Sequence, residues 1–283
     1  MILVIGGPTA SGKSARALAL AKQLNGEIVC ADSRQVYQGM TLGTASPTVQ
    51  EQQGIPHHGY GTRNPCEGYH VAQFVQDTDG FVQAILRRKR VAILVGGTGL
   101  YLRSWRFGID PAPPADPVLR QQLYQELQQK GASHLHERLR QIDPDTANRI
   151  QPQDHVRLVR ALEIHLKTGE TPSQTRPHWQ HHPPRMQATW LLVWPDQTCL
   201  IKNITQRANI LFQTEFIEEA CRLRQRIGNK HPLLQTMGYQ EALLYSDGLL
   251  SHQQAVERTI VRHRQYAKRQ KTWFRREDWW MRI

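Results

Sequence analysis

Short apolar runs alternate with a longer amphipathic stretch in the first hundred positions of the chain. Residues 2–5 form a continuous, largely β-branched run that ends in glycines, and 28–30 and 91–95 are further runs of this kind. Such runs are typical of strands buried on both faces of a sheet. Between the first two, Ala and Leu recur at helical spacing over residues 14–24. Strands that alternate with helices predict a parallel sheet with helices on its faces, and ligands bind such sheets beyond the carboxyl ends of the strands.

The apolar pattern changes in the middle of the chain. Residues 110–114 are too rich in proline to continue a helix or a central strand, and are predicted to be a linker. From 117 to about 169 the period is helical, and no strand signal interrupts it. A polar, proline-bearing stretch at 171–185 then leads back to a strand-like run at 190–194. The apolar stripes of the helical segments are Leu119, Leu123 and Leu127, then Val156, Val159, Leu162 and Leu166.

These elements predict an α/β fold with a parallel sheet flanked by helices, interrupted by an inserted all-helical domain. The α/β core is expected at residues 1–109 and 186–283, with helices at its C-terminal end. The inserted domain is expected at 110–185.

The most specific motif lies between the first predicted strand and the first predicted helix. Residues 7–14 fit the P-loop pattern G-x-x-x-x-G-K-[ST]. Backbone N–H groups in such a loop approach phosphate oxygens, Lys13 adds a point charge, and Ser14 can ligate Mg²⁺. The motif therefore predicts a P-loop NTPase-like core that binds a polyphosphate. The expected contacts are Gly7, Thr9, Ala10, Ser11, Gly12, Lys13 and Ser14.

The motif does not require that the polyphosphate be ATP. In P-loop NTPases an acid at the end of another strand helps to hold magnesium. Asp32, just after the run 28–30, could have this role, or it could be a solvated loop residue. The run 91–95 ends in Gly96-Gly97-Thr98, without an acid. The residues alone therefore leave open an ATP-dependent small-molecule kinase and a nucleic-acid-binding NTPase.

The composition points to a polyanionic partner. The chain has 36 Lys and Arg against 24 Asp and Glu, a net charge of +12, and such cations displace the counterions of phosphates. The 4 cysteines form no C-x-x-C pair, so reduced, buried thiols are expected. No apolar run approaches the roughly 20 residues that span a bilayer. We therefore expect a cytoplasmic protein with no membrane partner.

Several segments resemble those of the tRNA dimethylallyltransferase (tRNA isopentenyltransferase) family, in the family's order and over nearly the whole chain. These segments are residues 7–14, 32–37, 43–45, 54–58, 94–101, 157–163 and 266–275. The end of the chain carries no Cys/His cluster like that of many eukaryotic members, so the resemblance is to the bacterial type.

The resemblance implies that dimethylallyl diphosphate donates its five-carbon group to the exocyclic N6 of adenosine 37, beside the anticodon of tRNA, and releases diphosphate. It also implies Mg²⁺ as cofactor and the anticodon stem-loop as partner. Nothing in the sequence demands a second subunit, so a monomer is expected.

The resemblance also implies roles for individual residues. Asp32 is the expected general base, because an exocyclic amine is a poor nucleophile that reacts better as it loses its proton. Lys13 and the loop amides would stabilise the departing diphosphate, and Arg207 matches an arginine that grips it. The alternative for Arg207 is a surface position on a helix. Thr98 is placed beside the reacting centre, or caps a helix, and the two roles are compatible.

Two segments are expected to contact the tRNA. Residues 32–35 would read the flipped adenine, because the amide of Gln35 can pair with it in two places. Gln35 could instead be an ordinary turn residue. Basic and aromatic residues alternate over 262–276 and would either bind RNA or anchor a terminal helix. The expected tRNA contacts are Asp32, Ser33, Arg34, Gln35 and Thr98, with Val156, Arg157, Leu158, Val159 and Arg160 in the inserted domain.

Overall fold

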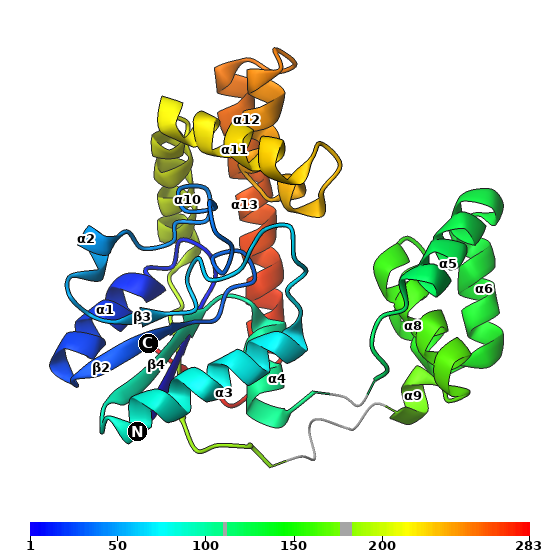
Figure 1. Ribbon diagram of the computed structural model, residues 1–283, viewed down its shortest axis with the longest axis horizontal. Helices are drawn as coiled ribbons and strands as arrows, with labels where there is room; N and C mark the ends of the chain where they lie inside the picture. The colour runs from blue at the N-terminus through cyan, green and yellow to red at the C-terminus, as the bar shows by residue number, and fades with distance from the viewer. Residues whose placement is uncertain (110–111, 176–182) are drawn as a thin grey trace. The chain divides into compact units, whose positions relative to one another are not determined.

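The computed structural model describes residues 1–109, 112–175 and 183–283 (Figure 1). It contains two compact units, the larger formed by Met1–Arg106 and Arg185–Ile283 and the smaller by Phe107–Pro184. The start of the predicted linker (110–111) and much of the second polar stretch (176–182) lie outside the described residues. Within the described ranges, no helix is both long and apolar enough to cross a membrane.

The larger unit carries all the strands of the described chain and most of its helices. Its elements are β1 (Ile2–Gly6), α1 (Lys13–Gln23), β2 (Gly26–Cys30), α2 (Val49–Gln52), β3 (His57–His58), α3 (Val71–Arg87), β4 (Val91–Gly96), α4 (Gly99–Phe107, whose last residue belongs to the smaller unit), β5 (Thr189–Leu192), α10 (Gln197–Leu211), α11 (Thr214–Ile227), the 3₁₀ helix η2 (Pro232–Gln235), α12 (Tyr239–Ser246), α13 (His252–Arg275) and β6 (Met281–Arg282).

The strands form one sheet of 6 strands in the order β3-β2-β4-β1-β5-β6, and every pairing is parallel. This confirms the predicted α/β class. The central β1 pairs with β4 and β5, so that Val4 lies between Leu94 and Trp190. The two-residue edge strands β3 and β6 were not predicted, because a run of two residues is too short to show a period.

Alternate residues of the central strands face opposite sides of the sheet. Leu3 and Ile5 pack with Ala17 and Ala21 of α1 on one side. Ile2, Val4 and Leu94 pack on the other side with α3, α4 and the end of α13, contributed by residues such as Phe74, Leu102 and Phe274. This burial on both faces explains why the strands read as continuous apolar runs.

Helices α10 to α13 gather beyond the sheet, at the top of the view in Figure 1. Their core contains Phe212, Phe216 and Tyr239, and it includes Val36 and Met40 from the segment after β2. The chain that leaves the carboxyl end of β2 is thus packed directly against these helices. Of the cysteines, Cys30 is buried as expected, whereas Cys66 and Cys199 are exposed.

The smaller unit is entirely helical in its described part, with α5 (Pro117–Lys130), α6 (Ala132–Ile142), α7 (Pro144–Arg149), α8 (His155–Thr168) and α9 (Pro172–Thr175). Leu123 and Leu162 are in its core, and Leu119 and Leu127 pack against it. The expectation for α8 was partly wrong, because Val156 is 69% exposed and Leu166 is also exposed. Leu158 takes part in the core instead.

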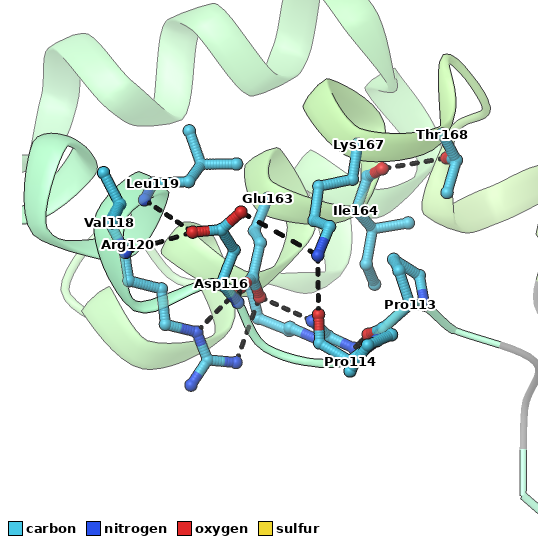
Figure 2. Close-up of polar contacts among 11 residues, drawn as sticks. Pro113, Pro114, Asp116, Val118, Leu119, Arg120, Glu163, Ile164, Lys167 and Thr168 are labelled. Carbon is cyan, nitrogen blue, oxygen red and sulfur yellow. Dashed lines mark hydrogen bonds and ion pairs between the residues drawn. The ribbon is translucent and has the colours of Figure 1, made fainter.

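A buried carboxylate fastens the start of this unit to α8. Glu163 is fully buried, and its oxygens accept hydrogen bonds from the guanidinium of Arg120 (3.0 Å) and from the N–H of Asp116 (2.7 Å) (Figure 2). Arg160 donates to Glu163 at 2.5 Å and to the carbonyl of Pro113 at 2.7 Å. These bonds hold the pKa of Glu163 below its usual value despite the opposing effect of burial.

Removal of this carboxylate is expected to loosen the smaller unit. Glu163→Gln loses charge-assisted bonds and leaves the two arginines without their acid, at a cost of about 2–3 kcal/mol, below the range for fully buried pairs because both arginines reach solvent. Hydrogen exchange of amides in α5 to α8 should accelerate. Glu137→Gln, at an exposed pair with Arg140, is the matched control and should leave exchange unchanged.

Candidate functional site

A cavity of about 420 Å³ lies in the larger unit, where β1 and β2 end. Its wall combines the P-loop, the two segments after β2, α10, the η2 turn and one face of α13. The lining residues are Thr9, Ala10, Ser11, Gly12, Lys13, Ser14, Ala15, Asp32, Ser33, Arg34, Gln35, Gly43, Thr44, Ala45, Arg207, Gln235, Thr236, Met237, Arg262, His263, Tyr266, Arg269 and Gln270. The predicted P-loop contacts except Gly7, and the whole segment 32–35, are therefore brought together.

Residues 9–14 of the P-loop line this cavity. Ala10 and Gly12 have positive φ values of 60° and 83°, and turns with such residues commonly form anion-binding concavities. Helix α1 begins directly after Gly12 without a side-chain cap, so its first N–H groups remain available to an anion. Gly7 stays behind the loop, where a Cβ would lie 2.8 Å from the hydroxyl oxygen of Ser11.

Lys13 and Arg207 are two of the cationic residues that line this cavity; the others are Arg34, Arg262 and Arg269. Lys13 donates to the carbonyl of Pro8 at 3.3 Å, and Arg207 of α10 donates to the carbonyl of Gly43 at 3.3 Å and to the hydroxyl of Thr9 at 3.5 Å. Within residues 1–109, 112–175 and 183–283, neither forms an ion pair with a carboxylate. Burial lowers the pKa of both side chains, and that of Lys13 falls to about 8 despite the raising effect of Asp32. An anion between them would restore the favourable environment of both charges.

The lowered pKa of Lys13 predicts a pH-dependent anion affinity. Lys13 is charged below pH 8 and loses its proton as the pH rises through about 8, so affinity falls on the alkaline side. The dissociation constant of inorganic diphosphate, measured by calorimetry, should rise by up to about tenfold per pH unit there. Lys13→Met should lack this component, while the titration of diphosphate itself remains in both proteins. Equal pH profiles would contradict the prediction.

Asp32 is fixed at the rim of the same cavity by its own turn. Its Oδ1 accepts hydrogen bonds from the N–H groups of Arg34 (2.8 Å) and Gln35 (3.3 Å). Neither bond uses Oδ2. Thr98 does not line the cavity, but its hydroxyl oxygen accepts a bond from the N–H of Ser33 at 3.3 Å and it precedes α4. Thr98 thus holds the segment that carries Asp32.

Gln35 is more constrained than the sequence indicates. Its Nε2 donates to the carbonyls of Thr44 (3.0 Å) and Ala45 (2.9 Å), which uses both amide hydrogens. Bidentate pairing with an adenine would require these bonds to be exchanged for bonds to the base.

Helix α13 contributes contacts that the sequence analysis missed. Gln270 accepts a hydrogen bond from the N–H of Thr9 and donates to the carbonyl of Gly97, each at 2.8 Å, and so ties the P-loop to the loop after β4. Tyr266 lines the cavity, and burial raises the pKa of its hydroxyl group. The predicted alternation of basic and aromatic residues marked this helix, but not which face turns inward. Phe274 is buried in the core, as the anchoring alternative expected.

The tRNA contacts expected on α8 divide by exposure. The side chains of Leu158 and Val159 are 0% and 2% exposed, so they offer no side-chain surface to RNA in the folded unit, and their expected contact stays a prediction. Arg160 is engaged by Glu163 and Pro113, as described above. Arg157 is 70% exposed beside its partner Asp154, and Val156 is exposed. Among the five residues of α8 that were expected to contact tRNA, Val156 and Arg157 have the side chains that a ligand can reach freely.

The cavity fits a magnesium ion that arrives with phosphates. Ser14 and Asp32 offer oxygen ligands in its wall. The described part of the chain contains no group of three or more His, Cys, Asp or Glu that could hold a metal ion. Mg²⁺ is commonly held by one or two protein oxygens together with substrate phosphates, which suits this arrangement.

The chain is similar to known proteins over nearly its whole length. The family model described as IPP transferase matches residues 35–277. A tRNA dimethylallyltransferase of Anaeromyxobacter dehalogenans is 42% identical over 98% of this chain and 92% of its own length. The tRNA isopentenylpyrophosphate transferase structure from Bacillus halodurans has a TM-score of 0.71 at 33% identity, covering 100% of this chain and 89% of that one. A eukaryotic dimethylallyltransferase acting on tRNA reaches a TM-score of 0.79 at 28% identity, over 96% of this chain and 69% of that one.

The matched region runs from the segment after Asp32 through α13, and so includes Arg207 and the helix that closes the cavity. Identity at this level over nearly the full length of both chains confirms the resemblance inferred from the motifs. The chain belongs to the IPP transferase family.

Proposed function

We propose that this protein transfers the dimethylallyl group of dimethylallyl diphosphate to the exocyclic N6 of adenosine 37 in tRNA. The coarser activity, prenyl transfer to tRNA, follows from membership in the family and from its named relatives. The observation that carries the finer proposal is a cavity whose wall combines the P-loop, the buried cations Lys13 and Arg207, and the carboxylate of Asp32.

In the proposed reaction, N6 attacks C1 of the allylic donor as the bond between C1 and the diphosphate oxygen breaks. Asp32 accepts the proton that leaves N6, and its hydrogen bonds to Arg34 and Gln35 keep the carboxylate oriented. Lys13, Arg207 and the loop amides stabilise the negative charge that grows on the diphosphate. The products are the prenylated adenosine and free diphosphate.

Magnesium is the proposed cofactor, held by the Ser14 hydroxyl together with phosphate oxygens. When bound, it would neutralise part of the charge of the departing diphosphate. Thr98 is proposed to act beside the reacting centre through its bond with Ser33. The cytoplasmic location and the monomeric state remain predictions.

One assay tests the proposed reaction. The protein is incubated with magnesium, labelled dimethylallyl diphosphate and unmodified tRNA, and the label recovered with RNA is measured. We expect incorporation that disappears when adenosine 37 is replaced by guanosine. Phosphate release from ATP without label in the RNA would instead identify a kinase or NTPase.

The exposed start of α8 is the proposed contact with the anticodon stem. Arg157→Ala should weaken tRNA binding and reduce the slope of log affinity against log salt by about 0.9 per lost phosphate contact. Filter binding at several salt concentrations measures both quantities. Arg140→Ala, at an exposed ion pair of α6, is the control. Unchanged affinity and slope in Arg157→Ala would place the RNA elsewhere.

A further inference from the structure

A buried carboxylate supports the loop that follows β2. Glu219 of α11 is 8% exposed, and its Oε2 accepts hydrogen bonds from the N–H groups of Thr41 and Leu42, both at 3.0 Å. Its Oε1 accepts one from the N–H of Gly43 at 3.1 Å and one from the hydroxyl of Tyr239 at 2.6 Å. Together these donors fill the acceptor positions that a carboxylate offers.

The same loop holds two site residues through its carbonyl oxygens. The carbonyl of Gly43 accepts the bond from Arg207 at 3.3 Å, and the carbonyls of residues 44–45 accept both bonds from Gln35. Residues 43–45 line the cavity. The N–H of Gly43 therefore faces Glu219, and its carbonyl faces the cation proposed to bind the diphosphate.

Close packing restricts this loop at Gly43. A Cβ on Gly43 would lie 2.3 Å from the ring of Tyr239 and 2.6 Å from that of Phe216. Both rings are fully buried and pack edge to face, so they do not yield to a displaced backbone. Movement toward the helices is blocked by these rings, and movement away would break the bonds to Glu219.

We propose that Glu219 is a positioning residue that, with Tyr239, sets Arg207 against the leaving diphosphate through the backbone of residues 41–43; this inference rests on the function proposed above. Without the carboxylate, several buried N–H groups lose their acceptor and the loop must move toward water to satisfy them. The carbonyl of Gly43 then no longer fixes the guanidinium, and the anion site loses its geometry.

The test uses the full chain and inorganic diphosphate with magnesium, measured by calorimetry. Glu219→Gln keeps the shape but places an amide N–H₂ group against N–H donors, and should weaken diphosphate binding by about 10- to 100-fold, the usual effect of a small misplacement. Glu218→Gln, at the exposed neighbouring position paired with Arg222, should bind as the wild type does. Diphosphate binding by Glu219→Gln equal to that of the wild type would overturn the proposal.

A double-mutant cycle separates positioning from a general loss of structure. In an Arg207→Ala background, Glu219→Gln should weaken diphosphate binding by less than about twofold, because the group through which it acts is gone. Independent, multiplying losses would overturn the proposal. If Glu219→Gln does not fold, Tyr239→Phe is measured in its place. This substitution removes only the 2.6 Å hydrogen bond from the Tyr239 hydroxyl to Glu219 and keeps the ring. It should weaken binding measurably, and unchanged affinity would overturn the inference.

The proposed function can fail separately in these experiments. A wild-type protein that binds no diphosphate would overturn the function and this inference with it. The inference alone would be overturned if the wild type binds diphosphate and transfers the prenyl group, and the Glu219→Gln and Tyr239→Phe variants bind diphosphate equally well.

Discussion

Asp32→Asn is expected to lower kcat for prenyl transfer by about 10²–10⁴-fold, the usual contribution of a positioned base. The substitution is nearly isosteric, and the asparagine Oδ1 can still accept the N–H groups of Arg34 and Gln35 that shape the turn. The cavity should therefore keep its form, and only the ability to take a proton from N6 is lost. Single-turnover transfer with saturating tRNA and donor measures this step directly.

The matched control for this prediction is Asp196→Asn. Asp196 also accepts a backbone N–H, that of Cys199 at 2.8 Å, but it caps α10 and does not line the cavity. The Asp196→Asn variant should transfer the prenyl group at the wild-type rate. Asp32→Asn should also bind tRNA within about twofold of the wild type, because the side chain keeps its size and hydrogen bonds. If it transfers the prenyl group at the normal rate, Asp32 is not the base.

Lys13→Met is expected to lower kcat/KM for the donor by about 10²–10³-fold, as the loss of one preorganised stabilising group usually does. The ammonium group is half-buried beside the loop and has no carboxylate partner among the described residues, so its charge is available to the diphosphate. A neutral side chain of similar length removes the charge while filling the space. Arg207 and the loop amides remain, which is why activity should be reduced and not abolished.

Lys22→Met provides the control for the charge itself. Lys22 lies on the same helix and contacts Gln53 at an exposed position. Both variants lose one positive charge, but only Lys13→Met should affect the donor. Rapid-quench measurement of transfer over a range of donor concentrations compares them. A loss of tRNA affinity with normal donor kinetics would show that Lys13 serves the RNA instead.

The sequence predicted those parts of the site that are local in the chain. The P-loop follows β1 and opens α1, so a single stretch of residues sets both the strand and the anion-binding turn. Asp32 was predicted at a strand end because the apolar run before it ends there. Parallel pairing of β1, β2 and β4 then brings these ends to one edge of the sheet, as their order and period indicated.

Other predictions failed because the spacing of apolar residues predicts that a helix has an apolar face, but it does not show where the buried part of that face begins and ends. On α8 the expected apolar stripe included Val156 and not Leu158, whereas the structure buries Leu158 and exposes Val156. A rotation of a helix by part of a turn exchanges neighbouring positions between core and surface. Arg160 was expected to be free for RNA, although helical spacing alone puts Glu163 beside it, three positions along α8. Only its bond to the carbonyl of Pro113 depends on tertiary packing.

By itself the sequence determined the α/β class, the phosphate loop, the acidic residue beside it and the family, because each can be recognised from short contiguous segments of the chain. Only the tertiary structure decided that Gln270 reaches back to Thr9 across 261 positions and that Glu219 holds the loop of Gly43. The physical reason is that these contacts join backbone groups to distant side chains. A backbone N–H or carbonyl is the same at every residue, so nothing in the sequence marks which one a buried amide or carboxylate will meet.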